Sequence, residues 1–155
     1  MIRVLFVCLG NICRSPMAEA VMRHKVKEAG LEHAVTVDSA GTGDWHIGKP
    51  PHAGTRNILD QNKVPYDGIR ARQVTAMDAD RFDYIIAMDT QNAKDISRIF
   101  GGQRAHVIRL LDLLVEETSK DVPDPYYTGN FELVYRLIDD ACDRLLSKIR
   151  QDHQL

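Results

Sequence analysis

The sequence has no long apolar run and no marked excess of charge of either sign. Nothing in its 155 residues approaches the ~18 consecutive apolar residues that a membrane span requires. The short apolar stretch at the N-terminus ends at Gly10 and Asn11, before the length and cleavage site that a signal peptide needs. The net charge of −2 argues against a broad basic surface. We therefore expect a cytoplasmic protein without a nucleic-acid or membrane partner.

Cysteine is scarce. The three cysteines are Cys8, Cys13 and Cys142, and an odd number fits reduced thiols better than a disulfide framework. The six histidines are scattered, and no second cysteine pair is present to complete a zinc site. We expect no metal and no organic cofactor. Cys142 falls on the apolar face of a helical pattern, where a core position is the simplest interpretation.

Repeats, low-complexity tracts and linkers are also missing, and strand-length apolar runs alternate with helical patterns. Strands are predicted over 3–8, 34–41, 83–89 and 105–110, and helices over 16–29, 52–62, 90–100 and 131–149. This alternation predicts one α/β domain spanning 1–155, with a four-stranded parallel sheet flanked by helices on both faces. In such sheets ligands bind beyond the carboxyl ends of the strands.

The first strand-to-helix turn carries the segment "VCLGNICRSP", residues 7–16. A zinc site would lack two ligands, and a redox pair would leave Arg14 without a role, because the spacing of Cys8 and Cys13 is not C-x-x-C. An anion-binding loop uses every residue. Between a buried strand and a helix N-terminus, successive backbone N–H groups and the helix dipole hold a phosphate-sized anion.

Within this loop each residue type has a task. The residues that we expect to line the bound anion are Leu9, Gly10, Asn11, Ile12 and Cys13. Gly10 permits close backbone approach and a strained φ, and Asn11 suits a left-handed turn. The planar fork of Arg14 binds two anion oxygens at once. Ser15 is the expected N-cap of the helix, with Pro16 at its first position and Gly30 at its end.

Cys8 lies at the base of the loop, where the positive field favours the thiolate, the nucleophilic form of the side chain. The hydroxyl of Ser15 can donate a hydrogen bond to that sulfur. A thiolate aimed at a bound phosphorus is suited to phosphoryl transfer. The spacing C-x5-R-S in a strand-to-helix turn therefore predicts phosphoryl-transfer chemistry, with Cys8, Arg14 and Ser15 in the catalytic centre.

A general acid is needed to protonate the leaving group, and "DVPDPYYTG" offers one. Asp124 stands between Pro123 and Pro125, which stiffen its backbone. The alternative is that Asp124 only shapes a Pro-rich turn. Asp121 has no proline on either side and is the weaker candidate.

Three aromatic residues are candidates for the walls of the site. Tyr126 and Tyr127 follow the expected acid and can flank a flat substrate ring, or else pack in a loop or the core. Trp45 is the only tryptophan and lies in the polar, glycine-rich stretch "GTGDWHIGKPP". A bulky apolar residue there favours recognition of a ligand.

The segments "VCLGNICRSPMAEA", "VDSAGT", "IGKPPH", "ARQVT", "FDYIIAMD" and "VPDPYY" together resemble the low-molecular-weight protein tyrosine phosphatases, in that family's order and over nearly the whole chain. The resemblance implies hydrolysis of phosphotyrosine in proteins through a cysteinyl-phosphate intermediate. It also implies that Asp124 later acts as a base on water. We expect a monomer or weak dimer.

The resemblance assigns further residues. Ser39 matches a serine that supports the loop asparagine, here Asn11. Ile69 stands where the family usually has a histidine that also bonds this asparagine, so one support of the loop is missing. Cys13 matches a cysteine that forms a reversible disulfide with the nucleophile, although it can also be an ordinary loop residue.

Three alternatives share this fold. Protein-arginine phosphatases carry threonine at the position of Ile12, and an apolar side chain there favours an aromatic phosphoester. Thioredoxin-coupled arsenate reductases need further cysteines between Cys13 and Cys142, where the sequence has none. A non-enzymatic anion-binding module would keep the loop but would not require both Cys8 and Asp124.

Overall fold

The computed structural model describes residues 1–102 and 106–155. Its sheet has four parallel strands in the order β2-β1-β3-β4. The strands are β1 (Ile2–Cys8), β2 (Val35–Gly41), β3 (Tyr84–Ala87) and β4 (Val107–Arg109). The predicted α/β class and its four-stranded parallel sheet are confirmed.

Strand β1 is central and buried on both faces. Val4 and Phe6 face one core, and Leu5 and Val7 face the other, and all four are fully buried. Such a strand reads as a continuous apolar run because neither face meets water. Its last residue, Cys8, is therefore held at a fixed point of the sheet.

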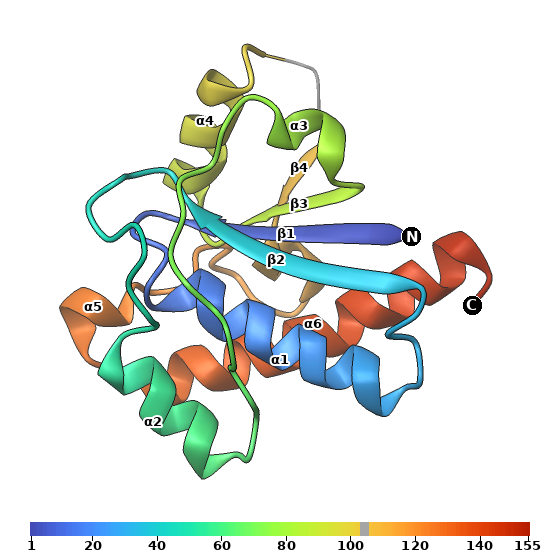
Figure 1. Cartoon of the computed structure of the whole chain (residues 1–155), viewed down its shortest axis with the longest axis horizontal. Helices are drawn as coiled ribbons and strands as arrows, with labels where there is room; N and C mark the ends of the chain where they lie inside the picture. Colours follow the sequence, from blue (N-terminus) through green and yellow to red (C-terminus); the bar gives the residue numbers. More distant parts are fainter. Residues whose placement is uncertain (103–105) are drawn as a thin grey trace.

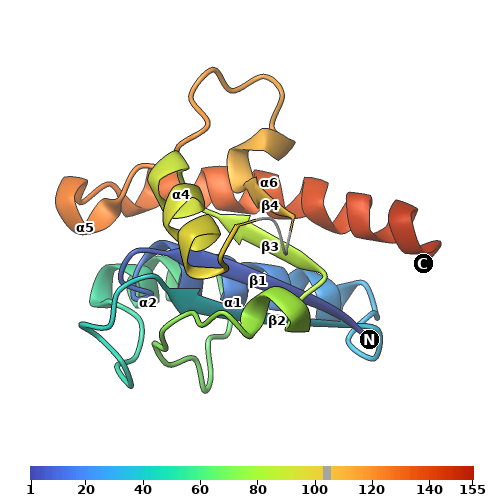
Figure 2. The ribbon, with the colours of Figure 1, turned by 90° about the horizontal axis from the view of Figure 1, so that it is seen from above.

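Helices cover both faces of the sheet. The helices are α1 (Arg14–Glu28), α2 (Ala53–Gln61), α3 (Asp78–Arg81), α4 (Thr90–Ile99), α5 (Pro125–Thr128) and α6 (Phe131–His153), with a 3-10 turn η1 (Leu110–Leu113). Figure 1 shows α1, α2 and α6 on one side and α3 and α4 on the other. Figure 2 shows α6 running along the molecule, with α5 near its N-terminal end. Among the described residues, no helix has an apolar stretch long enough to cross a bilayer.

Several predicted boundaries are wrong. Helix α1 begins at Arg14 with Cys13 as its N-cap, so Ser15 is a helical residue and not the cap. The residue after its C-cap Ala29 is Gly30, at φ 71°. Strand β4 covers only part of the predicted 105–110, of which Ala105 lies outside the described residues. The four-residue elements α3, α5 and η1 were not predicted, since one helical turn leaves no periodic pattern in a sequence.

The chain passes from β1 to β2 on one side and later returns to β3 on the other side of β1. The carboxyl ends of β1 and β3 thus form the point at which strand order reverses, where open parallel sheets bind ligands. In both views this end of β1 faces away from the two chain termini. The loop 9–13 lies there.

Candidate active site

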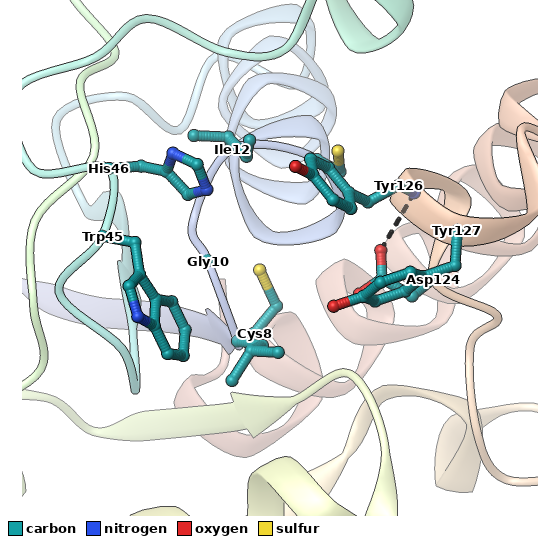
Figure 3. A pocket seen from close by; sticks show the side chains of 10 residues that line it. Cys8, Gly10, Ile12, Trp45, His46, Asp124, Tyr126 and Tyr127 are labelled. Atoms are coloured by element: carbon teal, nitrogen blue, oxygen red, sulfur yellow. Dashed lines mark hydrogen bonds between the residues drawn. The ribbon is translucent and has the colours of Figure 1, made fainter.

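A cavity of about 310 Å³ opens at the carboxyl end of β1. Its lining residues are Cys8, Leu9, Gly10, Ile12, Cys13, Trp45, His46, Asp124, Tyr126 and Tyr127. In Figure 3 the Cys8 sulfur points into the space between Trp45 on one side and Asp124 and Tyr127 on the other. Nine of these ten residues were predicted from the sequence as site residues, and the tenth, His46, was not.

The loop backbone adopts the left-handed conformation at Asn11, with φ 56°, as predicted. The prediction of a strained φ at Gly10 is wrong, because Gly10 is not among the residues with positive φ. The close approach of another side chain is what favours glycine there. A Cβ on Gly10 would lie 3.2 Å from Cδ2 of His46, so a side chain would press on that ring.

The Cys8 sulfur has two polar neighbours. The backbone N–H of Asn11 donates to Sγ at 3.3 Å, and the Ser15 hydroxyl lies 3.0 Å from Sγ. The N–H donor stabilises negative charge on sulfur, and the hydroxyl does so when its hydrogen is directed at Sγ. Ser15 is fully buried beneath the cavity floor, and the first turn of α1 fixes its position.

The side chain of Asn11 is buried in the protein, and Asn11 is not among the residues that line the cavity. Its Nδ2 donates to the hydroxyls of Ser15 at 2.8 Å and Ser39 at 3.0 Å, and its Oδ1 accepts from the backbone N–H of Arg72 at 2.9 Å. Ile69 is buried and apolar, and Asn11 holds its three bonds without a side-chain partner at that position.

Arg14 is also buried below the loop. Its Nη1 donates to Oδ2 of Asp89 at 2.6 Å and to the carbonyl of Val122 at 3.0 Å, and Nη2 lies 3.3 Å from Oδ2 of Asp124. Burial alone would lower its pKa, but the negative charge of Cys8, Asp89 and Asp124 raises it. Nε is buried with no hydrogen-bond partner among the described residues. An unpartnered guanidinium donor at this place is suited to an incoming anion oxygen.

Asp124 is the N-cap of α5, with Pro125 at the first position of the helix. Its Oδ1 accepts from the Tyr126 backbone N–H at 3.1 Å while Oδ2 faces Arg14. The carboxylate is therefore oriented at both oxygens and lies at the cavity wall (Figure 3). A protonated Asp124 can give its proton to a leaving oxygen in this space.

Asp121 has a different role. Its Oδ1 accepts from both the backbone N–H and the hydroxyl of Thr90, each at 2.7 Å, and these bonds lower its pKa. It is not among the residues that line the cavity. Asp121 thus connects its loop to the start of α4.

The walls are exposed aromatic side chains. Trp45 is 63% exposed, Tyr126 50% and Tyr127 74%, although all three are large and apolar. Gly43 accommodates the tryptophan, because a Cβ there would lie 2.0 Å from the indole ring. Exposed rings around a concave floor are suited to a flat aromatic ligand.

Two residues were missed by the sequence analysis. Asp89 caps α4 by accepting from the Asn92 N–H at 2.7 Å and orients Arg14. Its position directly after β3 was the available signal, because the ends of parallel strands converge. His46 lines the cavity beside Trp45, but a histidine in a polar loop carries no pattern that distinguishes it.

Cys13 and Cys142 are in surroundings that disfavour the thiolate. Burial, followed by the charge of Cys8, raises the pKa of Cys13 to about 12. Burial likewise raises the pKa of Cys142, which is fully enclosed in the core as predicted. All three cysteines are free.

One cluster of acidic side chains lies outside the cavity. Asp139, Asp140 and Asp143 gather on α6. The Lys25 ammonium lies 2.8 Å from both Asp139 and Asp143, so a cation of the chain itself already occupies their neighbourhood.

Comparison with known proteins agrees with this geometry. A model of the family described as low molecular weight phosphotyrosine protein phosphatase matches residues 3–155. The chain belongs to this family. The resemblance stated from the sequence motifs is thereby confirmed.

Two relatives match this chain over all or nearly all of their length. The low molecular weight protein-tyrosine-phosphatase YfkJ of Bacillus subtilis (strain 168) is 53% identical over 156 residues, covering all of both chains. PtpA of Staphylococcus aureus (strain Newman), with the same description, is 47% identical over 155 residues, covering all of this chain and 98% of the relative.

Solved structures show the same fold. The crystal structure of YfkJ superposes with a TM-score of 0.96 at 52% identity, covering 99% of this chain and 97% of the other. A second neighbour, the Drosophila arginine phosphatase DARP, has a TM-score of 0.88 at 32% identity and covers 97% and 98%.

Proposed function

We propose that this protein is a phosphatase that hydrolyses phosphotyrosine in proteins, and aryl phosphates in general, through a cysteinyl-phosphate on Cys8. The observation that carries the proposal is the Cys8 sulfur at the floor of an aromatic-walled cavity, with a buried arginine below it and a carboxyl group at its wall. A cytoplasmic location, a monomeric or weakly dimeric state, and the absence of nucleic-acid and membrane partners remain predictions.

Substrate binding begins with the phosphate dianion in the loop. The N–H groups of residues 9–14 and the Nε and Nη2 of Arg14 are its proposed donors. Since Nη2 contacts Asp124 in the free site, the phosphate displaces this carboxylate from the guanidinium. Asp124 in its protonated form is then free to act as the general acid of the first step.

In the first chemical step the Cys8 thiolate attacks phosphorus. The S–P bond forms as the P–O bond to the tyrosine breaks, and Asp124 gives its proton to the leaving phenolic oxygen. Arg14 and the loop N–H groups stabilise the charge on the transferring phosphoryl oxygens. The tyrosine ring lies between Trp45 and Tyr127 in this arrangement.

In the second step the Asp124 carboxylate takes a proton from water, and the oxygen of that water attacks the phosphorus. The P–S bond breaks and inorganic phosphate leaves. Ser15, 3.0 Å from Sγ, donates to the departing thiolate. Without this donor a buried thiolate is a poorer leaving group.

A protein-arginine phosphatase is the second candidate, favoured by the DARP neighbour. Ile12 opposes it, because this side chain packs with Cys13, Ala71 and Phe131 and presents apolar surface to the cavity. A guanidinium-phosphate carries N–H donors that would gain no acceptor there.

The test is turnover of phosphotyrosine and phosphoarginine peptides of one sequence. We expect the native chain to prefer phosphotyrosine and Ile12→Thr to narrow that preference. Higher kcat/KM on phosphoarginine would overturn the substrate assignment. Cys8→Ser provides the blank for contaminating phosphatases.

A further inference from the structure

A buried hydrogen-bonded chain connects the nucleophile to a carboxyl group that the proposed reaction does not use. Its members are Cys8, Ser15, Asn11, Ser39 and Glu19, all of them buried. The Ser39 hydroxyl donates to Oε1 of Glu19 at 2.6 Å, the shortest bond of the chain. Three further contacts continue to the sulfur through Asn11 and Ser15.

The donors and acceptors of this chain are arranged in one consistent direction. Because the Ser39 hydrogen goes to Glu19, its oxygen accepts from Nδ2 of Asn11. The second Nδ2 hydrogen goes to the oxygen of Ser15. The hydrogen of Ser15 is then directed to Sγ of Cys8 at 3.0 Å, or to the more distant Ala40 carbonyl at 3.5 Å. An ionised Glu19 accepts only, and so it fixes the first bond of the series.

Glu19 can change charge near neutral pH. Burial raises its pKa to about 7, opposed by the bond from Ser39. The charged groups facing it are Asp38 of β2, which raises the pKa, and Arg23 of α1 and Arg72, which lower it. Arg72 is itself paired with Asp38 at 3.0 Å and Asp78 at 3.1 Å, so it does not neutralise Glu19 directly.

Protonation of Glu19 changes which group can donate the hydrogen bond between Ser39 and Glu19. A carboxylic acid can donate as well as accept, so the Ser39 hydrogen is no longer confined to one direction. A bond to a carboxylate is also stronger than one to a neutral acid. Ser39 then holds Asn11 less firmly, and Asn11 is the residue that directs both the loop and Ser15.

We propose that Glu19 is a positioning residue for Cys8, and that its carboxylate acts through Ser39 and Asn11 to aim the Ser15 hydroxyl at the nucleophilic sulfur. The proposal rests on the phosphatase function proposed above. It adds an ionisation outside the cavity to the groups that set the pH dependence of the reaction.

The test compares kcat/KM of the native chain and Glu19→Gln across pH 5.5–8.5 on para-nitrophenyl phosphate, a range of about 1.5 units on either side of the carboxyl's shifted value. Taking the ratio of the two cancels ionisation of the substrate and of Asp124. We expect the ratio of native kcat/KM to that of Glu19→Gln to be near one in acid and to rise about fivefold, with a midpoint near pH 7. This rise corresponds to the difference in strength between a hydrogen bond to a charged carboxylate and one to a neutral acid. A ratio independent of pH would overturn the proposal.

Ser39→Ala removes the connection while leaving Glu19 in place. In this background Glu19→Gln should no longer alter the pH profile. If Glu19→Gln changes the pH profile equally in the Ser39→Ala background, the charge acts through space. That result would contradict an action through Ser39 and Asn11. If Glu19→Gln does not fold, the profile of Ser39→Ala alone decides, since it should lack the same ionisation.

Asp139→Asn on α6 is the matched control, because it removes a partly buried carboxylate that is paired with Lys25 and outside this chain. We expect its profile to follow that of the native protein. Absence of any Cys8-dependent turnover in the native chain would instead contradict the phosphatase function itself, and so the two failures are distinguishable.

Discussion

Nη2 of Arg14 lies 3.3 Å from Oδ2 of Asp124, so the cation proposed to bind phosphate and the proposed acid are an ion pair. Arg14 is 2% exposed and Asp124 23%. Solvent reaches the carboxylate but not the guanidinium. The pairing keeps Asp124 at the cavity wall, and we expect a bound phosphate to take the place of this carboxylate at the arginine.

Replacement of Arg14 by lysine should reduce kcat/KM by about 10²–10³-fold, the usual cost of removing one transition-state donor. Lysine cannot present two parallel donors, and it cannot contact Asp89 and Asp124 together. Arg98→Lys is the control, because Arg98 is 75% exposed and, among the described residues, its ion pair is with Asp95 of its own helix. Retention of native kcat/KM by Arg14→Lys would refute the proposed role of the Arg14 guanidinium in binding phosphate.

Asp124→Asn should lower kcat by about 10²-fold on phenyl phosphate, whose leaving group needs a proton. The decrease should be smaller on para-nitrophenyl phosphate, whose phenolate leaves readily. Asp121→Asn is the matched comparison, because the Asp121 carboxylate accepts two hydrogen bonds from Thr90 and does not line the cavity. If Asp121→Asn rather than Asp124→Asn shows dependence on the leaving group, the acid has been wrongly assigned.

The stability of the fold should fall as pH rises from about 4.5 to 7. Burial raises the pKa of Glu19 in the folded chain from 4.5 to about 7, so the folded state retains a proton that the unfolded state has lost. This contribution is present below pH 4.5 and is lost through pH 7, by about 3 kcal/mol at 1.36 kcal/mol per pH unit. Urea unfolding at several pH values measures it, and Glu19→Gln should flatten the dependence. An equal slope in both proteins would rule out Glu19 as its source.

Oxidation by peroxide should be reversed by thiol reductants, with Cys13 as the partner of Cys8. The pKa of Cys13 is raised to about 12, so Cys8 is the residue that reacts first. Cys13→Ala should lose activity irreversibly faster than the native chain. Equal rates of irreversible loss would leave Cys13 without this role. Cys142→Ala controls for removal of a buried thiol elsewhere.

Long elements and the cysteine loop could be predicted from the sequence because their patterns are local. The apolar run of β1 and the periodicity of α6 each specify one kind of element. The motif C-x5-R-S and the flanking prolines of Asp124 identified the centre of the cavity. Trp45 was found because a large apolar side chain in a polar loop is conspicuous.

The errors arose where tertiary contacts decide. Ser15 is a residue type that favours the N-cap, but helix α1 and its N-cap lie two residues earlier than predicted. The Ser15 hydroxyl contacts Cys8 and Asn11 instead. Glycine at position 10 is favoured by the ring of His46, which is distant in sequence. Asp89 and Glu19 reach the site through buried partners on other elements, and no spacing along the chain reveals such contacts.

The most direct test of the account is rapid-quench mass spectrometry of the chain during turnover of an aryl phosphate. We predict a phosphorylated form in which the phosphoryl group is on Cys8, formed and consumed at rates that match kcat. Asp124→Asn should still bear this group, and Cys8→Ser should have neither the group nor the turnover. Continued hydrolysis by Cys8→Ser would contradict the account at its centre.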